Sequence, residues 1–339
     1  MHELRRDPLL GRWVAVLSES MSPSEYDIPP VSGKTEQSCI LCSGRESETP
    51  SEIASIRMND TLPNKPGWWV RAIPSFKPLF QVEGDLGRRG VGIYDRMNSV
   101  GANELIIESP EHNIKPEDMG LEQMERLITL YRDRLTDLSR DLRLRYILIY
   151  KNSRVDPGET FTHPISYLMA TPVIPKRIKD ELENAKQYYE YKERCIFCDI
   201  MREEMRVGDR IILETRNFIG FCPYAGSFPF ESWIIPKRHS CDFRDITTDE
   251  IEDMGFILMS VLKKLRAVFK EDLPLNFFLH TAPNQVPRRN FWHTLGEDFH
   301  WHLEIVPRLI RRTGFEWGSG FFILYTSPEN AAKYLREVG

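Results

Sequence analysis

Two short cysteine motifs constrain the fold of this chain more than any other feature. They are SCILCSG, with Cys39 and Cys42, and RCIFCDI, with Cys195 and Cys198. After each motif come an apolar segment that ends in a histidine, a long amphipathic segment, a second apolar segment and a further histidine. A repeated order of this kind predicts two copies of one α+β unit.

The amphipathic segments have the spacing of helices. They cover roughly 117–143 and 248–270, and their apolar residues recur every three or four positions. Thr247 or Thr248 would cap the second helix, and Glu250 and Glu252 would lie in its first turn. Each helix leads into an apolar strand, RYILIY or LNFFLH. We therefore predict a domain of residues 1–176 and another of residues 177–339, with a charged, helical segment at 176–192 near the boundary.

The cysteine pairs and the histidines that follow them predict two zinc sites. A structural zinc ion commonly takes two thiolates and two imidazoles in a tetrahedron, and distant histidines can complete a site that begins with a Cys-x-x-Cys turn. The expected ligands are Cys39, Cys42, His112 and His163 in the first half, and Cys195, Cys198, His239 and His300 in the second.

Other interpretations of these residues stay open. A single Cys-x-x-Cys could be a redox pair, His112 could be a solvated loop residue, and His163 could be a core histidine with one hydrogen bond. A different second site would use His280, His300 and His302 without the cysteines, but it would leave Cys195 and Cys198 without a role. Whether His280 or His302 joins the second metal site is not decided by the sequence.

Composition narrows the class of protein. The 339 residues carry a formal net charge of −5, with a pI of about 6.0, so bulk charge does not favour a nucleic-acid partner. The N-terminus lacks an apolar core of signal-peptide length, and no apolar run is long enough to predict a membrane span. We therefore expect a cytoplasmic protein with no membrane partner, in which cysteines serve as metal ligands or thiols.

Several segments resemble the galactose-1-phosphate uridylyltransferase family, a branch of the histidine triad superfamily. They are ELRRDPLLGRWV, YKNSRVDPGETFTHPISYL, PKRHSCDF, FHWHLEIVP and GFEWGSGFFI, and together they span nearly the whole chain. The resemblance implies two fused histidine-triad-like units, each an antiparallel sheet with a long packed helix, and it implies bound zinc and a homodimer. It also implies a nucleotide sugar or sugar phosphate as ligand and transfer of a nucleotidyl group through a covalent nucleotidyl-histidine. Related members act as nucleoside diphosphate sugar phosphorylases.

The resemblance also shows what the first half lacks. In the family the attacking histidine lies two residues after the zinc histidine, and here that position is Ile165. Isoleucine has no lone pair and cannot replace the imidazole nucleophile. Tyr167 stands where the family has a phosphate-binding glutamine, whereas Asn152, Gly158 and Thr160 match the family's substrate-binding loop.

The second half offers one histidine in a comparable position. His302 follows His300 by two residues, and strand periodicity would direct both side chains and Glu304 to one face. This resembles the strand of histidine triad hydrolases in which the middle histidine is the nucleophile. Two functions are therefore considered: a nucleotidyltransferase or phosphorylase that would use His302, and a catalytically degenerate, zinc-stabilised protein that binds a nucleotide or sugar phosphate.

Overall fold

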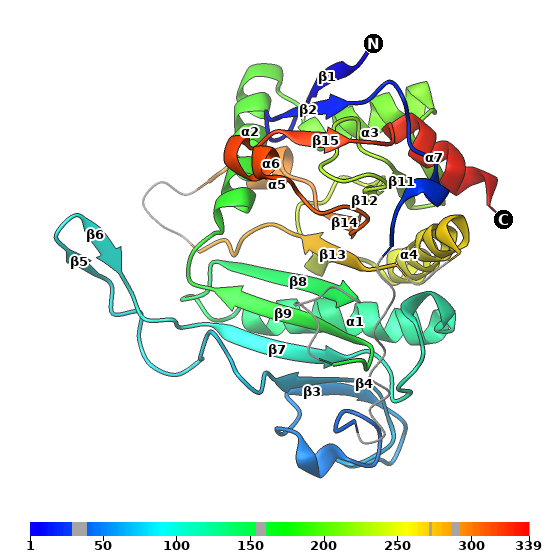
Figure 1. The fold of residues 1–339 in the computed structure, drawn as a ribbon. Helices are drawn as coiled ribbons and strands as arrows, with labels where there is room; N and C mark the ends of the chain where they lie inside the picture. The colour runs from blue at the N-terminus through cyan, green and yellow to red at the C-terminus, as the bar shows by residue number, and fades with distance from the viewer. Residues whose placement is uncertain (29–38, 154–160, 271–272, 287–291, 339) are drawn as a thin grey trace.

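A single antiparallel sheet organises the fold (Figure 1). The structure is a computed structural model, and it describes residues 1–28, 39–153, 161–270, 273–286 and 292–338. The sheet has ten strands in the order β10-β11-β12-β14-β13-β8-β9-β7-β4-β3, and every neighbouring pair is antiparallel. The strands of the second half are β10 (Ile211–Glu214), β11 (Phe218–Phe221), β12 (Ser232–Pro236), β13 (Leu275–His280) and β14 (His302–Pro307). Those of the first half are β3 (Ala54–Arg57), β4 (Trp68–Pro74), β7 (Ala102–Ile107), β8 (Tyr146–Ser153) and β9 (Ile165–Thr171).

The strand order repeats itself in reverse across the sheet. Starting from the centre, β8, β9, β7, β4 and β3 extend to one edge, and β13, β14, β12, β11 and β10 extend to the other. The two central strands pair with each other, with Asn152 opposite Asn276. This arrangement confirms the prediction of an α+β fold with two similar halves, and it adds that the two antiparallel sheets are continuous.

One long helix from each half packs on the sheet. Helix α1 (Leu121–Leu138) is shorter than the predicted segment because residues 116–118 form a separate 3-10 turn and Gly120 is the N-cap. Helix α4 (Thr248–Phe269) begins after Thr247, one of the two predicted N-caps, and Thr247 forms a capping box with Glu250. Glu250 lies in the first turn as predicted, whereas Glu252 follows that turn. The buried faces of the two helices and of the sheet join in one large core that includes residues of both halves. The charged segment forms α2 (Lys176–Lys192), also as predicted.

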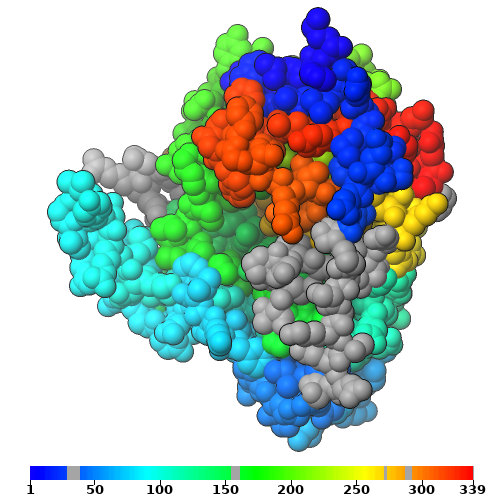
Figure 2. Space-filling view, in the orientation of Figure 1, coloured from blue at the N-terminus to red at the C-terminus, as the bar shows by residue number. Residues whose placement is uncertain are grey.

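The remaining elements lie around this framework. Strands β1 (Glu3–Arg6), β2 (Trp13–Val16) and β15 (Phe322–Leu324) form a small sheet, so the two ends of the chain meet. Helices α3 (Ile196–Val207), α5 (Leu295–Asp298), α6 (Gly314–Ser319) and α7 (Pro328–Glu337) belong to the second half. Strands β5 (Arg89–Val91) and β6 (Tyr94–Arg96) form a hairpin that projects from the body of the molecule (Figure 2). Within the described residues, no helix has the length and apolar character needed to span a bilayer.

Candidate metal centres and the buried polar cluster

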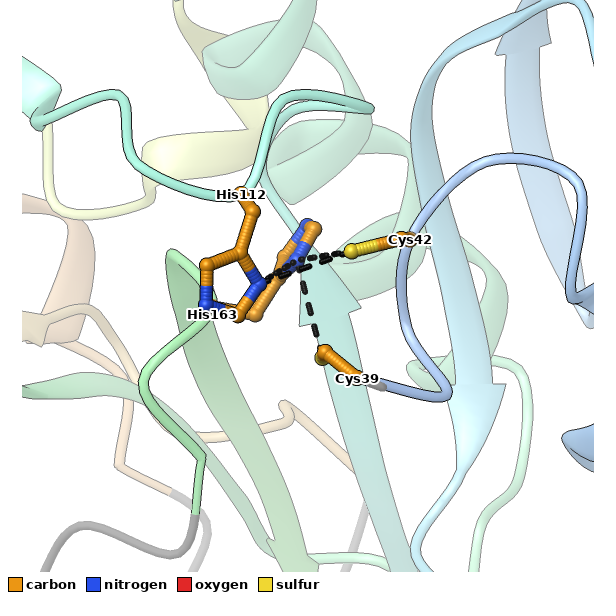
Figure 3. Close-up of side chains that lie close together, drawn as sticks. All are labelled: Cys39, Cys42, His112 and His163. Carbon is orange, nitrogen blue, oxygen red and sulfur yellow. Dashed lines mark hydrogen bonds between the residues drawn. The ribbon is translucent and has the colours of Figure 1, made fainter. Parts of the chain in front are cut away.

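The four predicted residues of the first half converge at one point (Figure 3). Cys42 Sγ lies 3.5 Å from His112 Nδ1 and 3.8 Å from His163 Nδ1, and Cys39 Sγ lies 3.9 Å from His163 Nδ1. The two histidine Nδ1 atoms are 3.3 Å apart. All four donor atoms lie within 4.8 Å of one another, so the first-half cluster offers the two sulfurs and two nitrogens of a tetrahedral metal site.

Hydrogen bonds at the far side of each ring orient these histidines. His163 Nε2 lies 2.8 Å from the carbonyl oxygen of Ser109, which requires Nε2 to carry the proton and leaves the Nδ1 lone pair directed at the cysteines. His112 Nε2 lies 3.1 Å from Thr162 Oγ1. Burial lowers the pKa of His163 to about 4, so its imidazole is neutral near pH 7, as a metal ligand must be.

The second-half cluster has the same donors on different local structure. Cys195 is the N-cap of α3 and Cys198 lies in its first turn, whereas Cys39 and Cys42 lie in an irregular turn. Cys198 Sγ is 3.3 Å from His239 Nδ1 and 3.5 Å from His300 Nδ1. His239 Nε2 faces the carbonyl oxygen of Gly296 at 2.9 Å, which again leaves Nδ1 for a metal.

The thiols of the second-half cluster have divergent acidities. A hydrogen bond from Cys195 and the neighbouring rings of His239 and His300 lower the pKa of Cys198. The same hydrogen bond, together with burial, raises the pKa of Cys195. The thiolate is the form in which cysteine binds metal, and the lowered pKa of Cys198 favours that form.

The structure separates His300 from the other two histidines of the alternative second site. His300 contacts the cysteines, whereas His280 and His302 lie with Glu181 in a third group whose donor atoms are within 4.8 Å of one another. Glu181 belongs to α2, and the sequence does not point to it, because no local motif connects a helical glutamate to a strand more than 90 residues away. His280 Nδ1 lies 2.9 Å from Glu181 Oε2.

Two further charged side chains, Arg177 and Glu304, lie against this third group, and the opposite charges stabilise one another. Arg177 Nη2 donates to Glu304 Oε2 at 2.5 Å, and Glu304 Oε1 lies 3.7 Å from His302 Nε2. Burial alone would raise the pKa of Glu304, but Arg177 and His280 hold it well below its ordinary value. Burial alone would lower the pKa of His280, but Glu181 and Glu304 raise it. We call these five side chains the buried polar cluster: Arg177, Glu181, His280, His302 and Glu304.

His302 is enclosed by aromatic rings. It begins β14 and is fully buried, its ring stacks on Trp233 at a centroid distance of 4.8 Å, and the Phe197 ring lies 5.1 Å away. A cavity of about 380 Å³ lies beside α3, and its wall includes Trp233 but not His302. His302 and Glu304 lie two residues apart on β14, whereas His300 precedes the strand, so a face shared by His300 and His302 stays a prediction.

Ile165 lies in an apolar core. It is 2% exposed at the start of β9 and belongs to a cluster with Leu41, Ile107 and Tyr167. Its carbonyl oxygen accepts a hydrogen bond from Lys151 Nζ at 2.9 Å, and the same ammonium group pairs with Glu108 at 2.7 Å. The position where the family resemblance expects a nucleophile is therefore filled by a packed hydrocarbon side chain.

The four predicted substrate-binding residues are only partly described. Asn152 is half-buried on β8, where its Oδ1 accepts a hydrogen bond from Asn276 Nδ2 at 2.7 Å. Tyr167 is buried, and its ring stacks on Tyr150 at a centroid distance of 5.1 Å. Gly158 and Thr160 lie outside the residues that the structure describes.

Comparisons with known proteins agree with this architecture. Residues 181–331 match the family model described as galactose-1-phosphate uridyl transferase, C-terminal domain. The chain is 30% identical to an ADP-glucose phosphorylase from Arabidopsis thaliana, over 99% of this chain and 93% of the relative. It is 28% identical to a galactose-1-phosphate uridylyltransferase from Thermotoga maritima, over 99% of this chain and 98% of the relative.

The solved structure of a relative aligns with the whole of this chain. The crystal structure of an ADP-glucose phosphorylase from Arabidopsis thaliana with bound ADP-glucose has a TM-score of 0.83 and 31% identity, covering 100% of this chain and 99% of that one. A uridylyltransferase structure at 24% identity has a TM-score of 0.75, which supports the fold. With its repeated sheet and its identity to relatives over nearly the full length, the chain belongs to the galactose-1-phosphate uridylyltransferase family.

Proposed function

We propose that this protein binds a nucleoside diphosphate sugar or a sugar phosphate and forms no covalent nucleotidyl-histidine. The observation that carries the proposal is Ile165, a side chain with 2% exposure at the position of the family's nucleophile. A packed isoleucine can neither attack phosphorus nor accept a proton. His163, which lies two residues earlier and precedes the strand, directs its nitrogens to Cys42 and to Ser109.

His302 does not substitute for the missing nucleophile. Its ring is fully buried and lies within 4.8 Å of both Trp233 and His280, measured between ring centroids. An attacking nitrogen needs a path to the α-phosphorus with the reacting atoms about 3–3.5 Å apart. We therefore assign His302 to the buried polar cluster, as a structural residue or a ligand of a metal held there.

Both Cys-His clusters fit zinc as a structural ion. Each offers two sulfurs and two imidazole nitrogens from separate segments, and such a closed donor set leaves no position for a substrate. In the first half the ion would hold the Cys39–Cys42 turn against the ends of β7 and β9. In the second half it would hold the start of α3 against the ends of β12 and β14.

The relatives support the ligand class. A crystal structure of an ADP-glucose phosphorylase with 31% identity contains bound ADP-glucose. Asn152, which matches the family's substrate-binding loop, lies on β8 at the centre of the sheet. These observations favour a nucleotide sugar over an unrelated ligand.

Calorimetry and peptide mass analysis together test the proposal. We expect saturable binding of ADP-glucose or UDP-glucose to the zinc-loaded full chain, and no nucleotidyl adduct in digests of protein incubated with either compound. His302→Asn is the matched variant, and it should bind the nucleotide sugar as the unaltered chain does. An adduct on a histidine peptide, or no binding of either nucleotide sugar, would overturn the proposal.

Nucleotidyl transfer or phosphorolysis is the second candidate. It is favoured by the 30% identity to an ADP-glucose phosphorylase over 99% of the chain. Position 165 carries no imidazole and the imidazole of His302 is buried. The nucleotidyl group would therefore have to pass directly from the donor phosphate to the acceptor phosphate. Release of glucose 1-phosphate from ADP-glucose in the presence of phosphate, insensitive to His302→Asn and without an adduct, would establish this candidate.

A further inference from the structure

Two arginines that follow β14 share one aromatic partner. The guanidinium carbons of Arg308 and Arg312 lie 4.9 and 4.5 Å from the ring centroid of Phe228. Arg312 also lies 4.4 Å from the centroid of Phe322 and 5.4 Å from that of Trp317. These rings come from three segments: Phe322 lies on β15, Trp317 on α6 and Phe228 in the loop before β12.

Neither cation has a carboxylate partner among the residues described. The polar contact of Arg308 is a long one, 3.5 Å from Nη1 to Asn276 Oδ1. Arg312 Nε is buried without a hydrogen-bond partner within the described ranges. The charge of Glu316 acts on Arg312, but Glu316 Oε2 accepts hydrogen bonds from the backbone N–H and the hydroxyl of Thr313, at 2.8 and 3.2 Å.

Several other arginines of the second half do have carboxylate partners. Arg210 pairs with Glu204 and Glu329, Arg177 pairs with Glu304, and Arg238 pairs with Glu250. Even Arg12, which lies 4.9 Å from the centroid of the same Phe322 ring, pairs with Asp7 at 3.0 Å. Arg308 and Arg312 therefore form a cationic pair that the protein itself does not neutralise within its described part.

Two positive charges near each other repel, and a bound anion between them would remove this repulsion. Burial lowers the pKa of Arg308, and burial together with the charges of Arg308 and Arg12 lowers the pKa of Arg312. Both side chains are half-buried and so remain accessible to a dissolved ion. Guanidinium groups match the oxygens of phosphate with two parallel hydrogen bonds, and they lose less hydration than an ammonium group does.

We propose that Arg308 and Arg312 form a binding site for a phosphate-bearing anion. Because both guanidinium carbons lie within 5 Å of one ring centroid, they are less than about 10 Å apart, a separation that one phosphate-bearing anion can bridge with an oxygen on each guanidinium group. The site connects to the centre of the sheet, because Asn276 contacts Arg308 and also donates to Asn152 on the neighbouring strand β8. It does not depend on the proposed nucleotide-sugar function, since free phosphate and the phosphate groups of a larger ligand offer the same chemistry.

Titration with inorganic phosphate, at constant ionic strength set with chloride, tests the site directly. We expect saturable binding by calorimetry and a rise in melting temperature that chloride does not reproduce. Arg308→Gln and Arg312→Gln should each weaken phosphate binding about tenfold or more, because each removes charge-assisted hydrogen bonds. Arg311→Gln is the matched control: Arg311 lies between the two in sequence and is exposed, and its loss should leave the affinity within about twofold.

A second arm with ADP-glucose identifies the source of the phosphate. If the variants weaken the binding of inorganic phosphate alone, the site takes a free anion. If they also weaken the binding of ADP-glucose, the site takes the phosphate groups of the nucleotide sugar. Arg312→Lys keeps the charge and the bulk but not the planar fork, so it should fold like the unaltered chain and bind phosphate less tightly. Equal phosphate affinity in the unaltered chain, Arg308→Gln and Arg312→Gln, or no phosphate binding by the unaltered chain, would overturn the proposal.

Discussion

The two histidine strands of this molecule begin alike and diverge within four residues. His163 and His300 each precede a strand and each direct Nδ1 towards a cysteine pair. Two and four residues later stand Ile165 and Tyr167 in the first half, and His302 and Glu304 in the second. The first pair lies in an apolar core, and the second pair lies in the buried polar cluster.

The difference shows that two clusters with the same candidate metal ligands can stand beside residues of opposite character. The donor sets of the two clusters are the same although the cysteines lie in a turn in one half and at the start of a helix in the other. The neighbouring positions instead follow the chemistry of their surroundings. Ile165 packs with Leu41 and Ile107, while Glu304 is held by Arg177 and His280.

Removing a cysteine from either cluster should have the largest effect on the molecule. We expect the unaltered chain to carry about two zinc ions, and Cys39→Ser and Cys195→Ser to lose one each and several kcal/mol of unfolding free energy, because metal binding contributes directly to folding. Metal analysis and thermal unfolding measure both effects. Cys241→Ser, at a half-buried cysteine outside the clusters, should retain both ions. Fewer than one ion in the unaltered chain, or normal stability with metal retained in both cluster variants, would contradict this expectation.

Conservative substitutions beside each cluster should cost different amounts of unfolding free energy in the two strands. Glu304→Gln removes a buried charge that Arg177 and His280 require, so we expect a loss of about 3 kcal/mol in unfolding free energy. Ile165→Val removes one methylene from an apolar site and should cost about 0.5–1.5 kcal/mol. Denaturant unfolding of both variants gives the comparison. Equal losses would mean that the charges of the buried polar cluster contribute little.

Restoring the histidine in the first half should not restore the chemistry. Ile165→His would bury an imidazole in an apolar cluster, at a cost of about 1–3 kcal/mol, and Tyr167 does not offer the donors of a glutamine side chain. We expect Ile165→His to be inactive or very weak in uridylyl exchange between UDP-glucose and hexose 1-phosphate. Ile165→His with Tyr167→Gln should be more active than the single variant. Strong exchange by the unaltered chain that survives His302→Asn would show that neither position explains the activity.

Much of the fold could be predicted because its determinants are local or repeated. The 3.6-residue spacing of apolar residues predicts α1 and α4, and the threonines at 247 and 248 predict the start of α4 to within one residue. The continuous sheet was not predictable, since the pairing of β8 with β13 depends on main-chain hydrogen bonds between distant segments. The division of the chain at residue 176 stays a prediction.

The candidate sites follow the same rule. The cysteine pairs carry a fixed local spacing, so their histidine partners could be inferred from the repeat. Glu181 could not, because its contact with His280 joins a helix to a strand 99 positions away in sequence. The cationic pair of Arg308 and Arg312 was equally hidden, because only the packed rings of Phe228 and Phe322 bring it together.

The smallest expected effects on unfolding free energy come from the residues that cap the two long helices. Thr247 accepts a hydrogen bond from the backbone N–H of Glu250, whereas Gly120 at the equivalent position of α1 has no side chain to accept one. Thr247→Ala should lower the unfolding free energy by about 1 kcal/mol, and Gly120→Ser should raise it by a few tenths, about 0.3 kcal/mol. The backbone angles of Gly120, φ −62° and ψ 154°, are those that serine adopts at an N-cap. Denaturant titrations of each variant beside the unaltered chain measure the change in unfolding free energy. They give the size of the loss for Thr247→Ala and the sign of the change for Gly120→Ser. A loss on Gly120→Ser would mean that α1 begins under a constraint that the cap does not relieve.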